Sequence, residues 1–365
     1  MLVLLPGFAA GIPPIDYDLT AVAKTGDIIN GKMLTGFKLP SLGPNAPAID
    51  SAGKVAFYAT YLEGSAVGEA IFTPASVTIK TGDVVNGRTL DGIGFAPALN
   101  DHGMLVVRGF LDSQASAIFT SNKLLAGTGS TIGGQTLTEV GSPAINNNGT
   151  VAFAGAFSGG TGIFTPKALL AKSGATVGGV TMDIFGPPAI NDRGTVAFQT
   201  WRSGRRKTAI LTPTTVLVNT GDTIDGKTLT DLLFGSALNS SDSVAFVGAF
   251  QGGMGIFTQK ALLIQSGDTV GGQKLTGFGL PAMDDSGTVA FLGAYAGGIG
   301  IFTQSALIAK TGDTVSGKIL TRFGPPAINR GGEMAFAAWF SDGSSAIVLA
   351  RPRLFQSSRG APVTE

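Results

Sequence analysis

Seven copies of one sequence unit occupy most of this 365-residue chain. Each copy has a turn similar to Thr-Gly-Asp, a Leu-Thr pair, a phrase similar to Pro-Ala-Ile-Asn-x-x-Gly-x-Val-Ala-Phe, and a final Ile-Phe-Thr. Successive copies lie 56, 47, 45, 47, 46 and 45 residues apart, and a period in this range indicates repeated structural units. The copies are marked by the turn glycines Gly26, Gly82, Gly129, Gly174, Gly221, Gly267 and Gly312.

One unit, residues 168–212, shows which structure is repeated. Its apolar runs are short, rich in Val, Ile, Phe and Thr, and bounded by Gly, Asn, Asp and Ser, as strands are. None has the length or the apolar spacing of a helix. Four short antiparallel strands about every 45 residues are typical of a β-propeller blade.

The two ends of the repeat predict how the ring closes. Residues 19–24 form a strand that precedes a Gly-Asp turn, and residues 346–349 match the Ile-Phe-Thr strand of the seventh unit. A solenoid would need polar capping repeats, and the sequence shows none. We therefore predict an all-β, seven-bladed β-propeller of four-stranded antiparallel blades, closed by the N-terminal strand completing the last blade. Residues 15–355 form this single domain, between tails at 1–14 and 356–365.

Composition excludes several classes of function. Charged residues are 13% of the chain and the net charge is +1, so the chain has no overall positive charge to attract nucleic acid, and we expect no nucleic-acid partner. The absence of cysteine excludes disulfides and thiolate metal sites, and the single histidine, His102, excludes a histidine metal cluster. No apolar run reaches the roughly 20 residues of a membrane-spanning helix. We expect no membrane insertion of the folded body and no cofactor.

The first ten residues, MLVLLPGFAA, are apolar and then small, similar to the back half of a secretory signal, although the basic start is missing. Two interpretations stay open, the remnant of an export signal and an N-terminal tail.

The repeated motif Asn-x-x-Gly-x-x-Ala-Phe at residues 146–153 recurs at 191–198 and 329–336, and at 50–57 and 284–291 with Asp in place of Asn. In these residues the chain resembles a family of bacterial proteins with NxxGxxAF tandem repeats and a choice of surface anchors. Two copies depart, with Val106-Val107 for Ala-Phe and Asp242 for Gly. The resemblance implies an exported or surface-displayed protein without an established activity, and the family's C-terminal anchor is not visible.

The geometry of tight turns explains the repeated polar residues, so no ligand is needed to account for them. Asn or Asp followed by Gly is typical of tight turns, because the side chain bonds nearby backbone and Gly accepts a positive φ. One carboxylate per blade cannot supply the six to eight oxygens that calcium prefers. We expect no metal site, and we expect turn caps at Asp27, Asp83, Asp222, Asp268 and Asp313.

Departures from the repeat are the better indicators of function, because a symmetric scaffold does not need them. The first group follows the Leu-Thr pair. If this segment enters the innermost strand, its charged residues ring one mouth of the channel; the alternative is ordinary loop variation. The group comprises Asp91, Glu139, Asp183, Asp231 and Arg322.

The second group lies in one loop after Val-Ala-Phe. Trp201 is followed by the cations Arg202, Arg205, Arg206 and Lys207. Guanidinium groups beside an indole can hold an acidic glycan, a phosphate or a carboxylate. The alternative is a solvated basic loop without a ligand.

We predict a secreted bacterial module that binds a glycan or protein partner at these loops or at the channel mouth, as a monomer. Its location would be extracellular, on the cell surface or in the periplasm. We assign no catalytic residue. The alternative is an enzyme of the glycosidase or lyase type, with Glu139, Asp183 and Asp231 as its carboxylates. A purely architectural role is a third interpretation.

Overall fold

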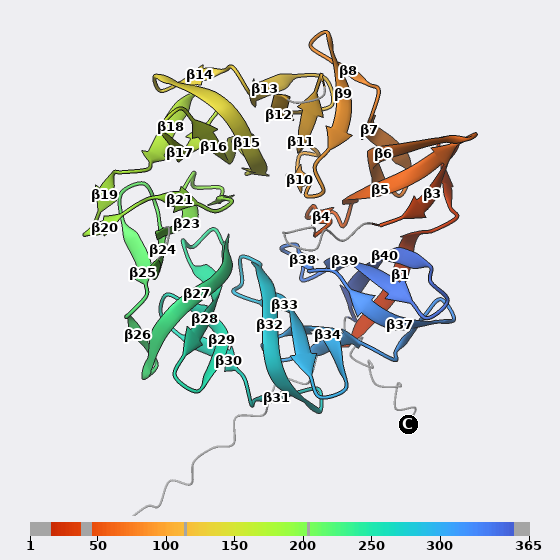
Figure 1. Cartoon of the computed structure of the whole chain (residues 1–365). Coiled ribbons are helices and arrows are strands. Elements are labelled where there is room, and N and C mark those ends of the chain that lie inside the picture. The colour runs from red at the N-terminus through yellow and green to blue at the C-terminus, as the bar shows by residue number, and fades with distance from the viewer. Residues whose placement is uncertain (1–15, 38–45, 113–114, 203–204, 354–365) are drawn as a thin grey trace, which may run out of the picture.

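Seven blades of antiparallel strands are arranged as a ring around a central axis in the computed structural model (Figure 1). The structure describes residues 16–37, 46–112, 115–202 and 205–353, and only the backbone at residues 202, 205–207 and 234. All of the strand pairs are antiparallel, and each sheet follows the previous one along the chain. The predicted all-β, seven-bladed propeller is confirmed.

The first three blades show how the repeat becomes a sheet. Blade 1 comprises β2 (Ile28–Ile29), β3 (Lys32–Gly36), β4 (Ala48–Ile49), β5 (Val55–Glu63), β6 (Ala66–Thr73) and β7 (Ser76–Lys80). Blade 2 comprises β8 (Val84–Val85), β9 (Arg88–Ile93), β10 (Ala98–Leu99), β11 (Leu105–Leu111), β12 (Ala115–Phe119) and β13 (Leu124–Gly127). Blade 3 comprises β14 (Thr131–Ile132), β15 (Gln135–Ile145), β16 (Val151–Phe157), β17 (Gly160–Thr165) and β18 (Ala168–Lys172).

The next three blades repeat this plan. Blade 4 comprises β19 (Thr176–Val177), β20 (Val180–Thr181), β21 (Ile184–Phe185), β22 (Ala189–Ile190), β23 (Val196–Arg202), β24 (Arg205–Leu211) and β25 (Val216–Asn219). Blade 5 comprises β26 (Thr223–Ile224), β27 (Lys227–Leu238), β28 (Val244–Phe250), β29 (Gly253–Thr258) and β30 (Leu262–Gln265). Blade 6 comprises β31 (Thr269–Val270), β32 (Gln273–Met283), β33 (Val289–Tyr295), β34 (Gly298–Thr303) and β35 (Leu307–Lys310).

Blade 7 joins the two ends of the chain. It comprises β36 (Thr314–Val315), β37 (Lys318–Phe323), β38 (Ala327–Ile328), β39 (Met334–Phe340), β40 (Ser345–Pro352) and β1 (Tyr17–Lys24). β1 pairs with β40 from Tyr17 opposite Pro352 to Lys24 opposite Ala346. The N-terminal strand therefore completes the last blade, as predicted. This pairing leaves β40 with a partner on both sides, so it is not an open edge.

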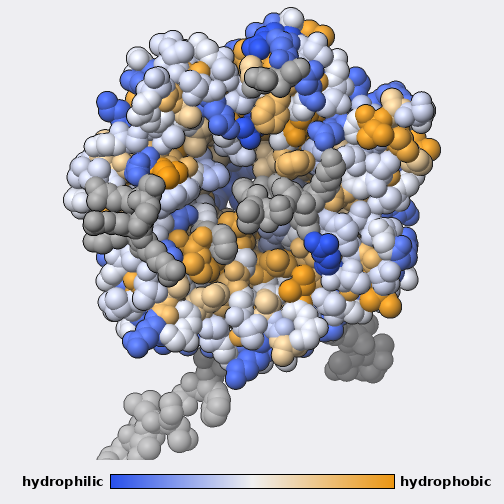
Figure 2. Space-filling view, in the orientation of Figure 1, coloured by the Kyte–Doolittle hydropathy of each residue, from blue (hydrophilic) through white to orange (hydrophobic). Residues whose placement is uncertain are grey.

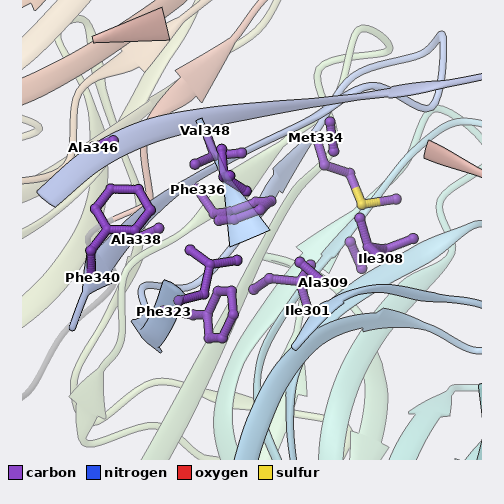
Figure 3. Close-up of a cluster of buried hydrophobic side chains, with 14 of the residues drawn as sticks. Ile301, Ile308, Ala309, Phe323, Met334, Phe336, Ala338, Phe340, Ala346 and Val348 are labelled. Atoms are coloured by element: carbon purple, nitrogen blue, oxygen red, sulfur yellow. The ribbon is translucent and has the colours of Figure 1, made fainter. Parts of the chain in front are cut away.

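The hydrophobic core lies between neighbouring blades, and the repeated Phe residues supply much of it. Figure 3 shows one such cluster, where Phe323, Phe336 and Val348 of blade 7 pack near Ile301 of blade 6. The phenylalanine of Val-Ala-Phe stacks on that of Ile-Phe-Thr in the next strand, for example Phe291 on Phe302 at 6.0 Å between ring centroids. Alternate side chains of a strand point to the same face of the sheet, so the repeated Phe residues are explained by packing between blades and do not require a ligand.

The innermost strand of each blade carries the Leu-Thr pair at its start and the Pro-Ala phrase at its end. In blades 3, 5 and 6 this strand is continuous but bulged, for instance between Val140 and Pro143 and between Phe278 and Pro281. A bulge tolerates proline because one residue leaves the hydrogen-bonded ladder. In the other four blades the strand is divided into two short segments, such as β21 and β22. The ends of these strands gather at the centre of the ring (Figure 1).

Candidate functional site

The Asn-x-x-Gly turns that follow the inner strands are tied to one another around the ring. The Oδ1 of Asn146 accepts the N–H of Thr150 within its own turn, at 2.9 Å. Its Nδ2 donates to the carbonyl of Asn191, the equivalent residue of the next blade, at 2.9 Å. Asn191 donates in the same way to the carbonyl of Asn239, and Asn329 donates to that of Asp50. The motif asparagine is therefore both a turn cap, as predicted, and a link between blades.

The residue after the motif asparagine forms a charged cluster within this ring of turns. Arg330 lies against carboxylates of three other blades, with Nε 2.7 Å from Oδ2 of Asp285 and Nη1 3.6 Å from Oδ2 of Asp101. Its Nη2 also pairs with Asp192. Asn147 donates from Nδ2 to both Asp101 and Asp192. We call Arg330, Asp101, Asp192 and Asp285 the Arg330 cluster. Each member follows, within a few residues, the inner strand of its own blade, so the cluster lies at one end of the central channel.

A cavity of about 990 Å³ occupies the centre of the ring and is lined by residues of all seven blades. Figure 2 shows a hollow at this place, with hydrophobic side chains gathered along its lower side. Prolines form much of the wall, and they give a stiff apolar surface without N–H donors. These prolines are Pro97, Pro143, Pro187, Pro188, Pro281, Pro325 and Pro326.

The polar part of the cavity wall is concentrated at the junction of blades 4 and 5. Asp231 on β27 accepts a hydrogen bond at Oδ1 from the Thr208 hydroxyl of β24, at 2.8 Å, and another from the backbone N–H of Leu232 at 2.9 Å. Thr208 stands opposite Trp201 in the β23–β24 pair. Gln199 donates from Nε2 to the carbonyl of Leu232, at 2.8 Å. Blade 4 is thereby joined to blade 5 beside the cavity.

Trp201 borders both the central cavity and a smaller pocket. Its side chain borders the central cavity on one side and a smaller pocket of about 150 Å³ on the other. The indole lies near Gly186, where an added Cβ would come within 3.4 Å of it. Trp201 is 37% exposed, which is unusual for so large a side chain. It is one of the few aromatic residues available to a ligand.

The charged residues that were predicted to ring the channel mouth have different surroundings in different blades. Of these residues only Asp231 borders the cavity. Glu139, at the equivalent position of blade 3, reaches Arg108 of blade 2 at 2.9 Å and is 64% exposed. Arg322 lies over the Trp339 ring, 5.9 Å from its centroid. Asp91 and Asp183 do not line the cavity. The residues at this position therefore differ between blades and make different local contacts.

The basic loop is described only in part. Trp201 lies within the described residues, whereas the side chains of Arg202, Arg205, Arg206 and Lys207 lie outside them. Their backbone belongs to the β23–β24 hairpin, where Arg202 stands opposite Arg205. Their predicted role in binding stays a prediction.

The Gly-Asp turns have the expected structural role. Oδ2 of Asp27 accepts the backbone N–H of Lys24 at 2.9 Å, and Asp222 and Asp313 do the same for Asn219 and Lys310. Within the described ranges, no group of three or more His, Cys, Asp or Glu side chains could hold a metal ion. Across the same residues, no helix has the length and apolar character needed to cross a membrane.

Sequence reasoning missed two features of the site. The first is the Arg330 cluster: the residue after the motif Asn varies among Ser, Asp, Asn and Arg, and this variation was the available signal. The second is the apolar cavity wall: prolines in an inner strand are typical of positions that leave the hydrogen-bonded ladder.

These observations define the class of protein: a seven-bladed β-propeller with one large, mostly apolar central cavity among its described residues. Residues 15–307 match the model of a family described as a family of unknown function (DUF7453), and the chain belongs to this family. No curated protein sequence matches the chain.

Several solved structures are similar in fold. The WD40 β-propeller domain of Doa1 has 11% identity and a TM-score of 0.45, covering 95% of this chain and 100% of that one. A streptogramin B lyase has 10% identity and a TM-score of 0.43, covering 93% and 98%. BamB from Moraxella catarrhalis has 14% identity and a TM-score of 0.43, covering 92% and 100%. These likenesses concern the fold alone.

Proposed function

We propose that this protein is a non-catalytic binding propeller that holds its ligand in the central cavity. The observation that carries the proposal is the cavity itself, whose volume of about 990 Å³ is at the upper end of small-molecule sites. Its wall is mostly apolar and has a few polar groups converging at the junction of blades 4 and 5, which is the usual composition of a ligand site. Trp201 and Asp231, both departures from the repeat, stand at that junction.

The enzyme alternative has less support. A glycosidase needs two carboxyl groups about 5 to 10 Å apart on one bond. Asp231 is the only carboxylate among the described residues that line the cavity. Its equivalent Glu139 forms an ion pair with Arg108 away from the cavity. A scaffold role without a ligand would leave the position of Trp201 between two pockets unexplained.

We also propose export from a bacterial cell, to the surface, the medium or the periplasm. The resemblance to the NxxGxxAF repeat family and the apolar first ten residues support this. Expression of the full chain with cell fractionation tests it. Recovery of the protein outside the cytoplasm is expected, and retention in the cytoplasm of its natural host would contradict export.

The binding proposal is tested with a screen of small molecules, glycans and peptides, followed by titration calorimetry. Ala282→Phe places bulk on the cavity wall, and Val67→Phe places the same bulk on the strand β6, where Val67 is 75% exposed and does not line the cavity. We expect a ligand that binds one per chain, is lost in Ala282→Phe and is kept in Val67→Phe. A ligand that both variants retain would move the site out of the cavity and overturn the proposal.

A further inference from the structure

Most of the cavity wall offers only apolar contact. Leu233, Leu280, Leu292 and Ile328 line it together with the prolines, and these four residues come from blades 5, 6 and 7. Such a wall favours an apolar molecule, because burial of each CH₂ group contributes about 0.8 kcal/mol. The body of a ligand would lie against this side.

The described part of the cavity wall carries one charge, on the strand β27 that also carries Leu233. Asp231 is the only charged side chain among the described residues that line the cavity. Both of its hydrogen bonds from Thr208 and Leu232 go to Oδ1. Within the described part of the chain, Oδ2 receives no hydrogen bond, so it can accept one from a ligand. A carboxylate is an acceptor only, which selects a ligand that donates.

One neighbouring group agrees with a cationic ligand. Trp201 lines the cavity, opposite Thr208 in its hairpin. An indole beside a carboxylate is a favourable environment for an ammonium group.

We infer that the cavity selects an apolar molecule bearing a protonated amine, with the amine at Asp231 and the apolar body against blades 5 to 7. This inference rests on the proposed function of the central cavity as a binding site. The amine donates to Oδ2 of Asp231, and its charge is matched by that carboxylate. A hydrogen bond between two charged partners is about twice as strong as a neutral one.

Three probes of similar size test the inference on the wild-type protein by titration calorimetry: 3-phenylpropylamine, 3-phenylpropanol and 3-phenylpropanoate. We expect the amine to bind about tenfold more tightly than the alcohol, and the carboxylate to bind most weakly. The comparison needs no variant, so it does not depend on the folding of one. Tightest binding of the carboxylate would overturn the inference and would indicate that the cations at residues 202–207 select the ligand.

A matched pair of variants then locates the amine. Asp231→Asn is expected to reduce the preference for the amine over the alcohol to about twofold or less. Glu139→Gln removes a carboxylate at the equivalent position of blade 3, outside the cavity, and is expected to leave that preference unchanged. Equal effects of the two substitutions would mean that general charge attracts the amine, and would overturn the role of Asp231.

Failure of the inference can be told apart from failure of the proposed function. In one outcome, all three probes fail to bind while a different ligand binds the wild type and does not bind the Ala282→Phe variant. In that case only the amine preference is overturned. If no ligand responds to Ala282→Phe, the cavity itself is not the site and both proposals fail.

Discussion

At the scale of single residues, the motif asparagine makes two different hydrogen bonds at once. Its carbonyl oxygen caps its own turn, and its amide group donates to the backbone of the next blade. The side chain is buried, with 4% exposure at Asn146. Aspartate can perform the first task but not the second, because it has no donor when ionised. Two blades, with Asp50 and Asp284, therefore lack one link.

Asn146→Asp is predicted to lower the free energy of unfolding by about 2 kcal/mol, because it removes a buried donor and sets an oxygen against the Asn191 carbonyl. The reverse change, Asp284→Asn, is predicted to raise the free energy of unfolding by up to about 1 kcal/mol, because it adds the missing donor. Urea unfolding of both variants measures this. If both substitutions changed the free energy of unfolding in the same direction, the linking role of the amide would be contradicted.

Arg330 is predicted to stabilise the fold through its ion pairs with three carboxylates. Arg330→Gln leaves Asp101, Asp192 and Asp285 facing one another without a cation, and we expect a loss of about 1 kcal/mol. The loss should be larger at low salt, since screening weakens repulsion between the carboxylates. Arg193→Gln, which removes a single ion pair with Asp242, is the control and should cost less. Thermal unfolding at two salt concentrations distinguishes them, and a salt-independent loss would contradict the account.

At the scale of elements, the closing strand β1 is the most consequential one. It lies at the far end of the sequence from its partner β40, and it covers an edge that would otherwise expose unpaired backbone groups. Its side chains also enter the core, with Ala23 buried against the cluster of blade 1. The ring therefore depends on a contact between the two ends of the chain.

Deletion of residues 1–24 is predicted to lower the midpoint of thermal unfolding by at least about 10 °C, or to cause aggregation, because β40 becomes an open edge. Deletion of residues 1–14 is the control, and we expect its midpoint to stay within about 2 °C of the full chain. Scanning calorimetry of the three proteins makes the comparison. An unchanged midpoint for the longer deletion would contradict closure by β1.

At the scale of the whole molecule, symmetry and its exceptions have separate roles. Seven nearly equal units build the ring and its core, while the cavity wall differs from blade to blade. Trp201 and Asp231 meet at the junction of blades 4 and 5, where most of the polar residues that line the central cavity lie. In a ring of identical blades every side of the central cavity would be the same. The residues that differ between blades therefore decide how a ligand is oriented in the cavity.

The stability of the whole ring is predicted to fall in acid. Burial raises the pKa of Asp101, but hydrogen bonds from Ser51 and Asn147 and the charge of Arg330 outweigh it, so the pKa is below its usual value. Hydrogen bonds from Thr195 and Asn191 lower the pKa of Asp242 in the same direction. A folded pKa below the unfolded one stabilises the protein above about pH 4, and this stability is lost as the pH falls further.

Urea midpoints measured from pH 7 to pH 2 should therefore be level above about pH 4 and decline below it. Asp101→Asn should show a shallower decline, because one titrating group with a lowered pKa is gone. A midpoint that rises on acidification would contradict the signs of these shifts.

The fold was predictable from the sequence because each blade repeats the same local chemistry. The seven glycine turns, the paired Phe residues and the out-of-phase ends at residues 19–24 and 346–349 each point to the same ring. The site was less predictable, because it depends on which side chains converge at the axis. Glu139 and Asp231 occupy equivalent positions, yet one reaches Arg108 and the other borders the cavity. That difference comes from neighbours on the adjacent blade, which a repeat alignment does not show.

The central claim is that ligands enter the axis of the ring and are oriented by Asp231. Crystals soaked with 3-(4-bromophenyl)propylamine test it most directly, because bromine can be located by anomalous scattering. We expect a bromine peak inside the cavity beside Leu280, with the amine at the Asp231 carboxylate. Bromine bound only on the outer surface, with the cavity accessible and filled by water, would contradict it.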